Sequence, residues 1–126
     1  MERILDWNKY LDTAAKMVSE GIVMLKNENN ALPLDTDKEV AVFGRIQFHY
    51  YKSGTGSGGM VNVTKVVNIL DGLIDNGVKV NEKLLDTYRK WDKENPFDLG
   101  EGWGGEPWSQ KEMPLDERLV KETAKS

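Results

Sequence analysis

Residues 39–44 read EVAVFG, and this short apolar run decides the fold class of the 126-residue chain. Consecutive β-branched and aromatic residues of this kind are typical of a strand that is buried on both faces of a parallel sheet. A second run, VKV at 78–80, predicts another strand, and the helical pattern between the two begins with Thr64 as N-cap and stops at Asn76-Gly77. Strand, helix and strand in this order predict a parallel α/β sheet.

Three further helices are expected around these strands. Apolar residues recur at three- and four-residue steps from Trp7 to Glu28, which is typical of a helix with one buried stripe. Asn81 is a good N-cap for a helix that ends before Asn95-Pro96. A helical pattern resumes from Leu115 to Ser126.

The sequence therefore predicts part of a layered α/β sandwich, with a mainly parallel sheet and helices on both sides. Residues 1–126 are interpreted as one incomplete domain. Because a parallel sheet of two strands leaves its edges exposed, pairing of copies into a homo-oligomer is one expectation. The expected parts are a leading helix with an extended entry (1–34), a strand-loop-helix-strand-helix core (35–95), a loop rich in Gly, Trp and Pro (96–114) and a final helix (115–126).

Composition excludes several classes of function. The net charge is -4, and the 30% of charged residues are of mixed sign, so there is no basic stripe to bind nucleic acid or an anionic membrane. Without cysteines there is no disulfide framework, no thiolate metal site and no cysteine nucleophile. The first twelve residues lack the pattern of a secretory signal, and no run approaches the ~20 apolar residues of a membrane span, which predicts a cytoplasmic protein.

The most unusual stretch is SGTGSGG at residues 53–59. Gly54, Gly56 and Gly59 formally match a dinucleotide-binding fingerprint, but that fingerprint should begin where the strand ends, and here ten residues intervene. Two alternatives are a flexible surface turn and a binding loop for a neutral polar ligand. We favour the binding loop, because its hydroxyls can form hydrogen bonds while its glycines permit close approach of the ligand.

His49 is the one histidine of the chain, which makes it a poor basis for a metal site. We expect it to pack on Tyr50 or Tyr51 instead. No metal and no cofactor are predicted.

The 96–114 loop holds acidic and aromatic residues that could contact a sugar. Asp98, Glu101 and Glu106 are interpreted as solvated loop acids rather than as a glycosidase carboxylate pair, because no regular element holds them at a fixed separation. Trp103 and Trp108 could stack on sugar rings or could pin the loop to the core, and the sequence favours neither.

Three stretches together resemble glycoside hydrolase family 3, of the β-glucosidase type. Residues 20–34, EGIVMLKNENNALPL, are similar to the family's entry into its second domain. The strand at 39–44 that leads to KSGTGSG at 52–58 forms the second stretch, together with the helix and stop at 69–77. The third and least specific is LLDTY at 84–88 with the Trp-Gly-rich loop behind it.

The resemblance implies the first part of a second domain with a flavodoxin-like α/β sandwich. The complete enzyme would be a retaining β-glucosidase-type hydrolase that removes terminal nonreducing β-D-glycosyl residues. This segment would contain neither catalytic carboxylate and would be inactive alone. Its partners would be the carbohydrate substrate and the barrel domain of the same enzyme.

The resemblance also implies a role for the glycine-serine loop. Ser57 would form a hydrogen bond to the terminal sugar, Gly56 and Gly58 would shape the backbone around it, and Thr55 would belong to the same substrate-binding loop. The alternatives are a carbohydrate-binding module without catalysis and, as a second alternative, a nucleotide-binding α/β domain.

Overall fold

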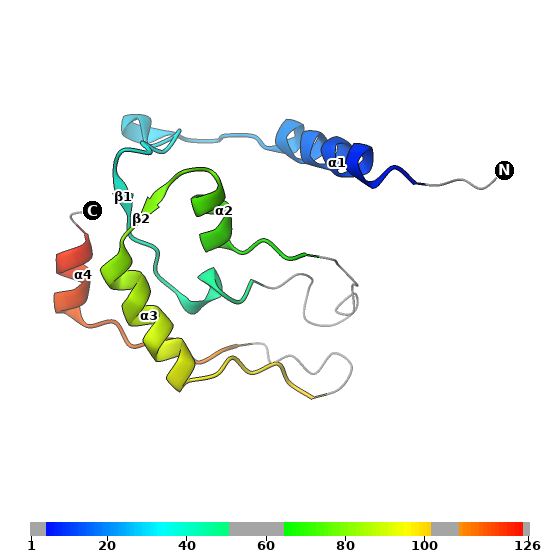
Figure 1. Ribbon diagram of the computed structural model, residues 1–126. Coiled ribbons are helices and arrows are strands. Elements are labelled where there is room, and N and C mark those ends of the chain that lie inside the picture. The colour runs from blue at the N-terminus through cyan, green and yellow to red at the C-terminus, as the bar shows by residue number, and fades with distance from the viewer. Residues whose placement is uncertain (1–4, 51–64, 102–108, 125–126) are drawn as a thin grey trace. The chain divides into compact units, whose positions relative to one another are not determined.

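The computed structural model describes residues 5–50, 65–101 and 109–124 of the chain (Figure 1). Two compact units, Met1–Pro33 and Leu34–Ser126, each have their own internal contacts. In the described part of the first unit the regular elements are helix α1 (Trp7–Gly21) and a short 3-10 turn (Glu28–Asn30). Those of the second unit, in chain order, are β1 (Glu39–Val40), a 3-10 turn (Arg45–Gln47), α2 (Ile69–Asp75), β2 (Lys79–Val80), α3 (Glu82–Glu94) and α4 (Glu117–Thr123).

The fold is mixed α/β, with a small sheet in which β1 and β2 run parallel. Glu39 lies opposite Lys79 and Val40 opposite Val80. The predicted parallel pairing is therefore confirmed, whereas the layered, flavodoxin-like sandwich stays a prediction.

The first strand is shorter than the expected run 39–44. It pairs over two residues because its partner ends early: Asn81 already begins the turn into α3, and its backbone N–H donates to the carbonyl of Val40 at 3.0 Å. Gly44, at φ +97°, then changes the direction of the chain in a conformation that favours glycine.

Helix α2 begins later than predicted. Thr64 lies outside the described residues, and residues 65–68 are not helical. The N-cap is Asn68, whose side chain accepts a hydrogen bond from the backbone N–H of Asp71 at 2.7 Å. The predicted stop is confirmed, since Gly77 follows the helix at φ +76°.

Helix α3 carries most of the core of the second unit. The side chain of Asn81 accepts from the N–H of Leu84 at 3.0 Å, which confirms the predicted cap. Two buried clusters lie along the helix, and Phe48 packs against both, so the turn after Gly44 is joined to the core. The first cluster contains Leu70, Val80 and Leu85, and the second contains Leu84, Tyr88 and Met113.

Helix α4 is held against α3 by packing and by charge. Leu119 packs on the second cluster, and the buried Thr123 donates its hydroxyl to the carbonyl of Leu119 at 2.8 Å. On the surface, Glu122 pairs with Lys83 of α3 and with Arg118, whose Nε lies 2.9 Å from the carboxylate. Hydrogen bonds from Lys83 first and Arg118 second lower the pKa of Glu122 from 4.5 to about 2.

In the first unit, α1 ends at Gly21 rather than at Glu28. Ile22 is extended (φ -81°, ψ 123°), and with Val23 it forms a β-branched pair that disfavours helix continuation. The side chain of Asn27 then closes a tight turn, because its amide donates to the carbonyl of Leu32 at 2.8 Å and its oxygen accepts from the N–H of Leu32 at 3.0 Å.

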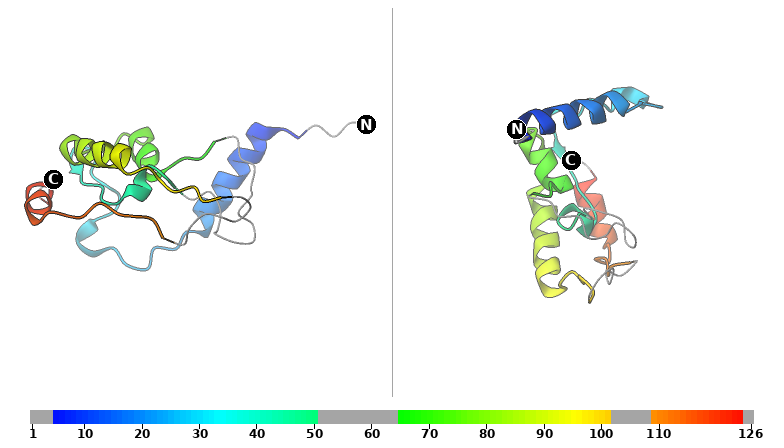
Figure 2. Two further views of the ribbon diagram at one scale, coloured as in Figure 1. Left: turned by 90° about the horizontal axis from the view of Figure 1, so that it is seen from below. Right: turned by 90° about the vertical axis from the view of Figure 1, so that its right-hand side faces the viewer.

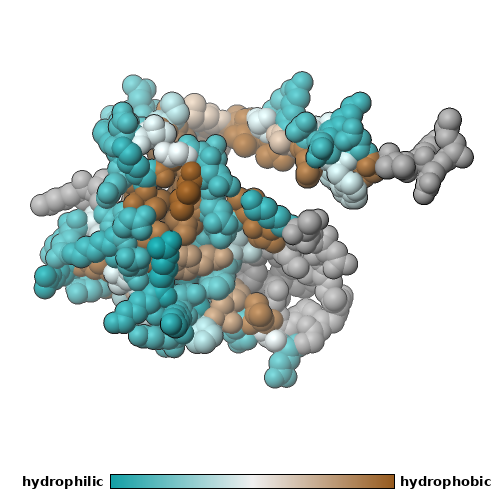
Figure 3. Space-filling model, in the orientation of Figure 1, coloured by the Kyte–Doolittle hydropathy of each residue, from teal (hydrophilic) through white to brown (hydrophobic). Residues whose placement is uncertain are grey.

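The apolar residues of α1 are not buried in the described structure. All fifteen residues of the helix are described, and none is buried. Figure 3 shows this apolar surface in brown along α1 and the segment that follows it. Among the described residues, no helix has the length and apolar character that crossing a membrane requires.

Substitution of Leu84 tests the assignment of α3 as the centre of the core. Leu84 is fully buried, so we expect Leu84→Ala to lower the free energy of unfolding by about 2–5 kcal/mol through lost burial and a residual cavity. Lys90→Ala is the matched control, because Lys90 lies on the exposed side of the same helix and its loss should cost less than about 0.5 kcal/mol. Urea unfolding measures both, and equal effects would contradict the assignment.

The pKa of Glu122 predicts an acid-dependent contribution to stability. A carboxylate whose pKa is lower in the folded than in the unfolded state stabilises the fold above the unfolded value of 4.5. That contribution is lost as the pH falls toward the folded value of about 2. We therefore expect the Tm difference between the wild type and Glu122→Gln to be present at pH 6 and to shrink toward zero between pH 4.5 and 2. A difference that is constant with pH would exclude the ion pair as its cause.

Candidate functional site

The site residues predicted from the sequence lie outside the described residues. This holds for the four loop residues Thr55, Gly56, Ser57 and Gly58, and for the tryptophans Trp103 and Trp108. The structure does describe the chain on both sides of each segment. The candidate site is therefore built from these flanking residues.

The turn that follows β1 leads toward the glycine-serine loop. Its first backbone hydrogen bonds run from Gln47 N to Gly44 O at 3.2 Å and from Phe48 N to Arg45 O at 3.0 Å. The buried side-chain amide of Gln47 donates back to the carbonyl of Gly44 at 2.9 Å. The turn is thus fixed by both its backbone and its own side chain.

Arg45 is the central residue of this turn, with only 3% of its surface exposed. Its guanidinium lies beside the C-terminal half of α3, where it contacts Asp92. The backbone of the turn lies next to the same helix in both views of Figure 2. Nη2 donates to Oδ1 of Asp92 and to the carbonyl of Asn95, both at 2.7 Å, and Nη1 donates to the carbonyl of Lys111 at 3.0 Å. One cation therefore joins three segments that are distant in sequence.

Aromatic rings surround the same guanidinium. Its central carbon lies 5.0 Å from the ring centre of Trp91 and 5.3 Å from that of Phe97. Both distances are within the range in which a cation is attracted to an aromatic face. Arg45 is buried beside these rings, and its burial strengthens the electrostatic attraction to Asp92.

The backbone of Arg45 is held as well. Its N–H donates to Oε2 of Glu112 at 2.8 Å, and Oε1 of the same carboxylate accepts from the N–H of Met113 at 2.7 Å. Glu112 thereby connects the turn to the returning end of the 96–114 loop. Close by, burial raises the pKa of Tyr88, although the backbone of Gly44 partly offsets the rise, so the phenol is protonated at neutral pH.

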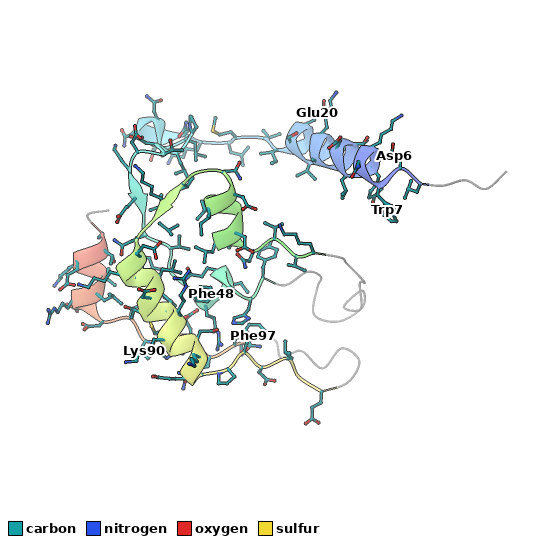
Figure 4. The ribbon with its side chains drawn as sticks, viewed as in Figure 1. Asp6, Trp7, Glu20, Phe48, Lys90 and Phe97 are labelled. Carbon is teal, nitrogen blue, oxygen red and sulfur yellow. The ribbon has the colours of Figure 1, made fainter. Side chains whose placement is uncertain are left out.

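His49 occupies the second oxygen of the same aspartate. Its Nε2 lies 2.7 Å from Oδ2 of Asp92, and its ring stacks on Phe97 at 4.6 Å between centres with an interplanar angle of 25°. Phe48, labelled with Phe97 in Figure 4, contacts the imidazole edge-on. The expected packing on Tyr50 or Tyr51 stays a prediction, because Tyr51 lies outside the described residues; the ring contacts that the structure describes for His49 are with Phe97 and Phe48.

The described ends of the 96–114 loop are tied to each other. The side chain of Gln110 accepts from the N–H of Asp98 at 3.1 Å and donates to its carbonyl at 2.7 Å. Lys111 donates its ammonium to the side chain of Asn95. Asp98 and Glu101 are exposed, as expected of solvated loop acids, whereas Glu106 lies outside the described residues.

We call Arg45, His49 and Asp92, with the rings of Trp91 and Phe97, the Arg45 cluster. The sequence analysis missed Arg45 and Asp92, because the contact joins residues 47 apart that match no motif. One usable signal was a cation placed directly after an apolar strand and its glycine. Within the described ranges, no group of three or more side chains could hold a metal ion. Asp92 binds both Arg45 and His49, whereas the buried Nε of Arg45 has no hydrogen-bond partner among the described residues. These bonds fix the geometry of the cluster.

Comparisons with known proteins agree with this architecture. The model of the glycosyl hydrolase family 3 C-terminal domain matches residues 22–125. The chain is 61% identical over 122 residues to a β-glucosidase of Ruminococcus albus, which covers 97% of this chain and 13% of that protein. It is 33% identical over 92 residues to β-glucosidase A of Butyrivibrio fibrisolvens, and this match covers 71% of this chain and 11% of that protein.

Solved structures give the same result. A β-glucosidase from Paenibacillus barengoltzii superposes with a TM-score of 0.81 at 50% identity, over 98% of this chain and 13% of that one. β-Glucosidase 3B from Thermotoga neapolitana, in complex with α-D-glucose, gives a TM-score of 0.70 at 29% identity, over 95% of this chain and 17% of that one. The chain thus spans between about a tenth and a sixth of the length of these relatives. With a family model that matches most of its length, it belongs to the glycosyl hydrolase family 3 C-terminal domain family.

Proposed function

We propose that this chain is a segment of a retaining β-glucosidase that hydrolyses terminal nonreducing β-D-glucosyl residues. The observation that carries the proposal is 61% identity, over 97% of the chain, to a protein named as a β-glucosidase. In this proposal, residues 1–126 are one incomplete domain with a layered, flavodoxin-like sandwich. The rest of the sheet and the barrel domain lie elsewhere in the same enzyme.

The two catalytic carboxylates belong to other parts of that enzyme. Retaining hydrolysis needs a nucleophilic carboxylate and an acid/base carboxylate about 5 Å apart. Asp98 and Glu101 are exposed, and Asp98 accepts from the N–H of Gly100 within the loop itself. Glu112, the third described acid of the long loop, is bound to the backbone N–H groups of Arg45 and Met113. These acids are therefore unsuited to either role, and the segment contributes substrate binding.

The glycine-serine loop is the proposed sugar contact. Ser57 forms a hydrogen bond to the terminal glucosyl unit, and Thr55, Gly56 and Gly58 shape the backbone around it. Trp103 and Trp108 are proposed to stack on sugar faces. The glucose complex of the Thermotoga neapolitana relative supports a glucose-binding role for the complete enzyme.

Removal of the Ser57 hydroxyl tests this contact. A neutral hydrogen bond contributes about 1 kcal/mol or somewhat more, so Ser57→Ala in the complete enzyme should lower kcat/KM for a β-glucoside about five- to tenfold with an unchanged Tm. The measurement is steady-state hydrolysis of an aryl β-glucoside.

Ser53→Ala is the matched control, because it removes a hydroxyl from the same loop at a position to which no sugar contact is assigned. Its kinetics should equal those of the wild type. An unchanged kcat/KM in Ser57→Ala would contradict the assignment of Ser57.

Titration of the isolated 126-residue chain separates the alternatives. We expect no hydrolysis and almost no affinity for glucose, cellobiose or NAD in calorimetry, because the proposed loop completes a pocket whose other walls lie elsewhere. Tight sugar binding by the chain alone would instead indicate a carbohydrate-binding module. Tight binding of NAD would indicate a nucleotide-binding domain.

A further inference from the structure

The Arg45 guanidinium connects the ends of both loops that are proposed to contact sugar. Arg45 itself lies six residues before the segment 51–64. Its hydrogen-bond partners Asn95 and Lys111 lie on opposite sides of the segment 102–108. A single side chain therefore determines the separation of three described chain segments, all of which lead into or out of these loops.

A role in stability alone does not account for this arrangement. Removing two charges from water costs several kcal/mol per ion, and apolar residues of similar volume often stabilise a fold as well as a buried ion pair does. Arg45 is 3% exposed and the side chain of Asp92 19%. Hydrogen bonds are directional, whereas apolar contacts are not. Each hydrogen bond of this pair therefore fixes the orientation of one chain segment.

We infer that Arg45, with Asp92, is a positioning residue that holds the two sugar-contacting loops in register with each other. The inference rests on the proposed function and goes beyond it, because it assigns part of the substrate affinity to residues that do not touch the sugar. Arg45 fixes the position of the chain before the glycine-serine loop that contains Ser57. Through Asn95 and Lys111 it also fixes the distance between the two ends of the 96–114 loop.

His49 supports the same role from the other side of Asp92. The aspartate divides its two oxygens, with Oδ1 bound to Arg45 and Oδ2 bound to His49. His49 lies four residues after Arg45, so the aspartate holds the outgoing chain at two points. The side chain of His49 is 33% exposed, which makes this second point accessible to substitution without opening the core.

The test uses Arg45→Lys in the complete enzyme. A lysine keeps the charge but replaces the two separated donor nitrogens, which bind Lys111 on one side and Asp92 and Asn95 on the other, with one ammonium. We therefore expect kcat/KM for an aryl β-glucoside to fall about fivefold or more. Arg89→Lys is the matched control, because Arg89 lies on the exposed surface of the same α3 and, in the part of the chain that the structure describes, forms ion pairs with Glu82 and Asp86. Its kinetics should be unchanged.

A double-mutant cycle with Ser57→Ala separates positioning from general loss of stability. If Arg45 acts by placing Ser57, then Arg45→Lys/Ser57→Ala should be no more than about twofold worse than the poorer single variant. A fully multiplicative loss would overturn the inference. If Ser57→Ala leaves kcat/KM unchanged, the proposed sugar contact is rejected, and the cycle loses its basis. If Ser57→Ala lowers kcat/KM but Arg45→Lys leaves it at the wild-type value, only the positioning role is rejected.

His49→Phe gives a second measurement in case Arg45→Lys does not fold. Phenylalanine keeps the ring that stacks on Phe97 and, among the contacts to described residues, loses the bond to Asp92. We expect a folded enzyme with a Tm near that of the wild type and a kcat/KM lowered about threefold or more, again non-multiplicative with Ser57→Ala. A lower Tm with normal kinetics would show a structural role only and overturn the inference.

Discussion

The partly buried ion pair between Arg45 and Asp92 is the interaction on which the described part of the second unit depends. It brings together a turn after the first strand, the end of the longest helix of that unit and the returning end of a long loop. The turn and the returning end of the loop have too little regular structure of their own to fix their directions relative to α3. A guanidinium with several donors in one plane can fix all three, and it is buried beside the rings of Trp91 and Phe97.

Apolar packing positions the segments that carry this ion pair. Phe48 contacts both core clusters, and the buried side chains of α3 lie on the same helix as Asp92 and Trp91. The sheet contributes little area, since only two residues pair on each strand. The core is therefore organised around α3, and the Arg45 cluster lies where the end of this helix meets the chain that leaves β1.

The elements with local signals could be predicted from the sequence. Asn81 and Asn95 bound α3 as expected, Gly77 ends α2, and the order of strand, helix and strand gave the parallel pairing. The lengths could not be predicted, because β1 ends where Asn81 turns away and α1 ends at a β-branched pair within an otherwise helical pattern. The Arg45 cluster could not be predicted from the sequence, because its members are distant in sequence and an ion pair formed by tertiary packing leaves no periodic signal. The predicted sugar-contacting residues 55–58, Trp103 and Trp108 stay predictions.

A crystal structure of the complete enzyme with glucose bound tests the central claim most directly. The account predicts the hydroxyl of Ser57 within hydrogen-bonding distance of the sugar. It also predicts Arg45 bound at the same time to Asp92 and to the carbonyls of Asn95 and Lys111. A glucose held without Ser57, or a guanidinium released from these partners while the sugar is bound in place, would contradict it.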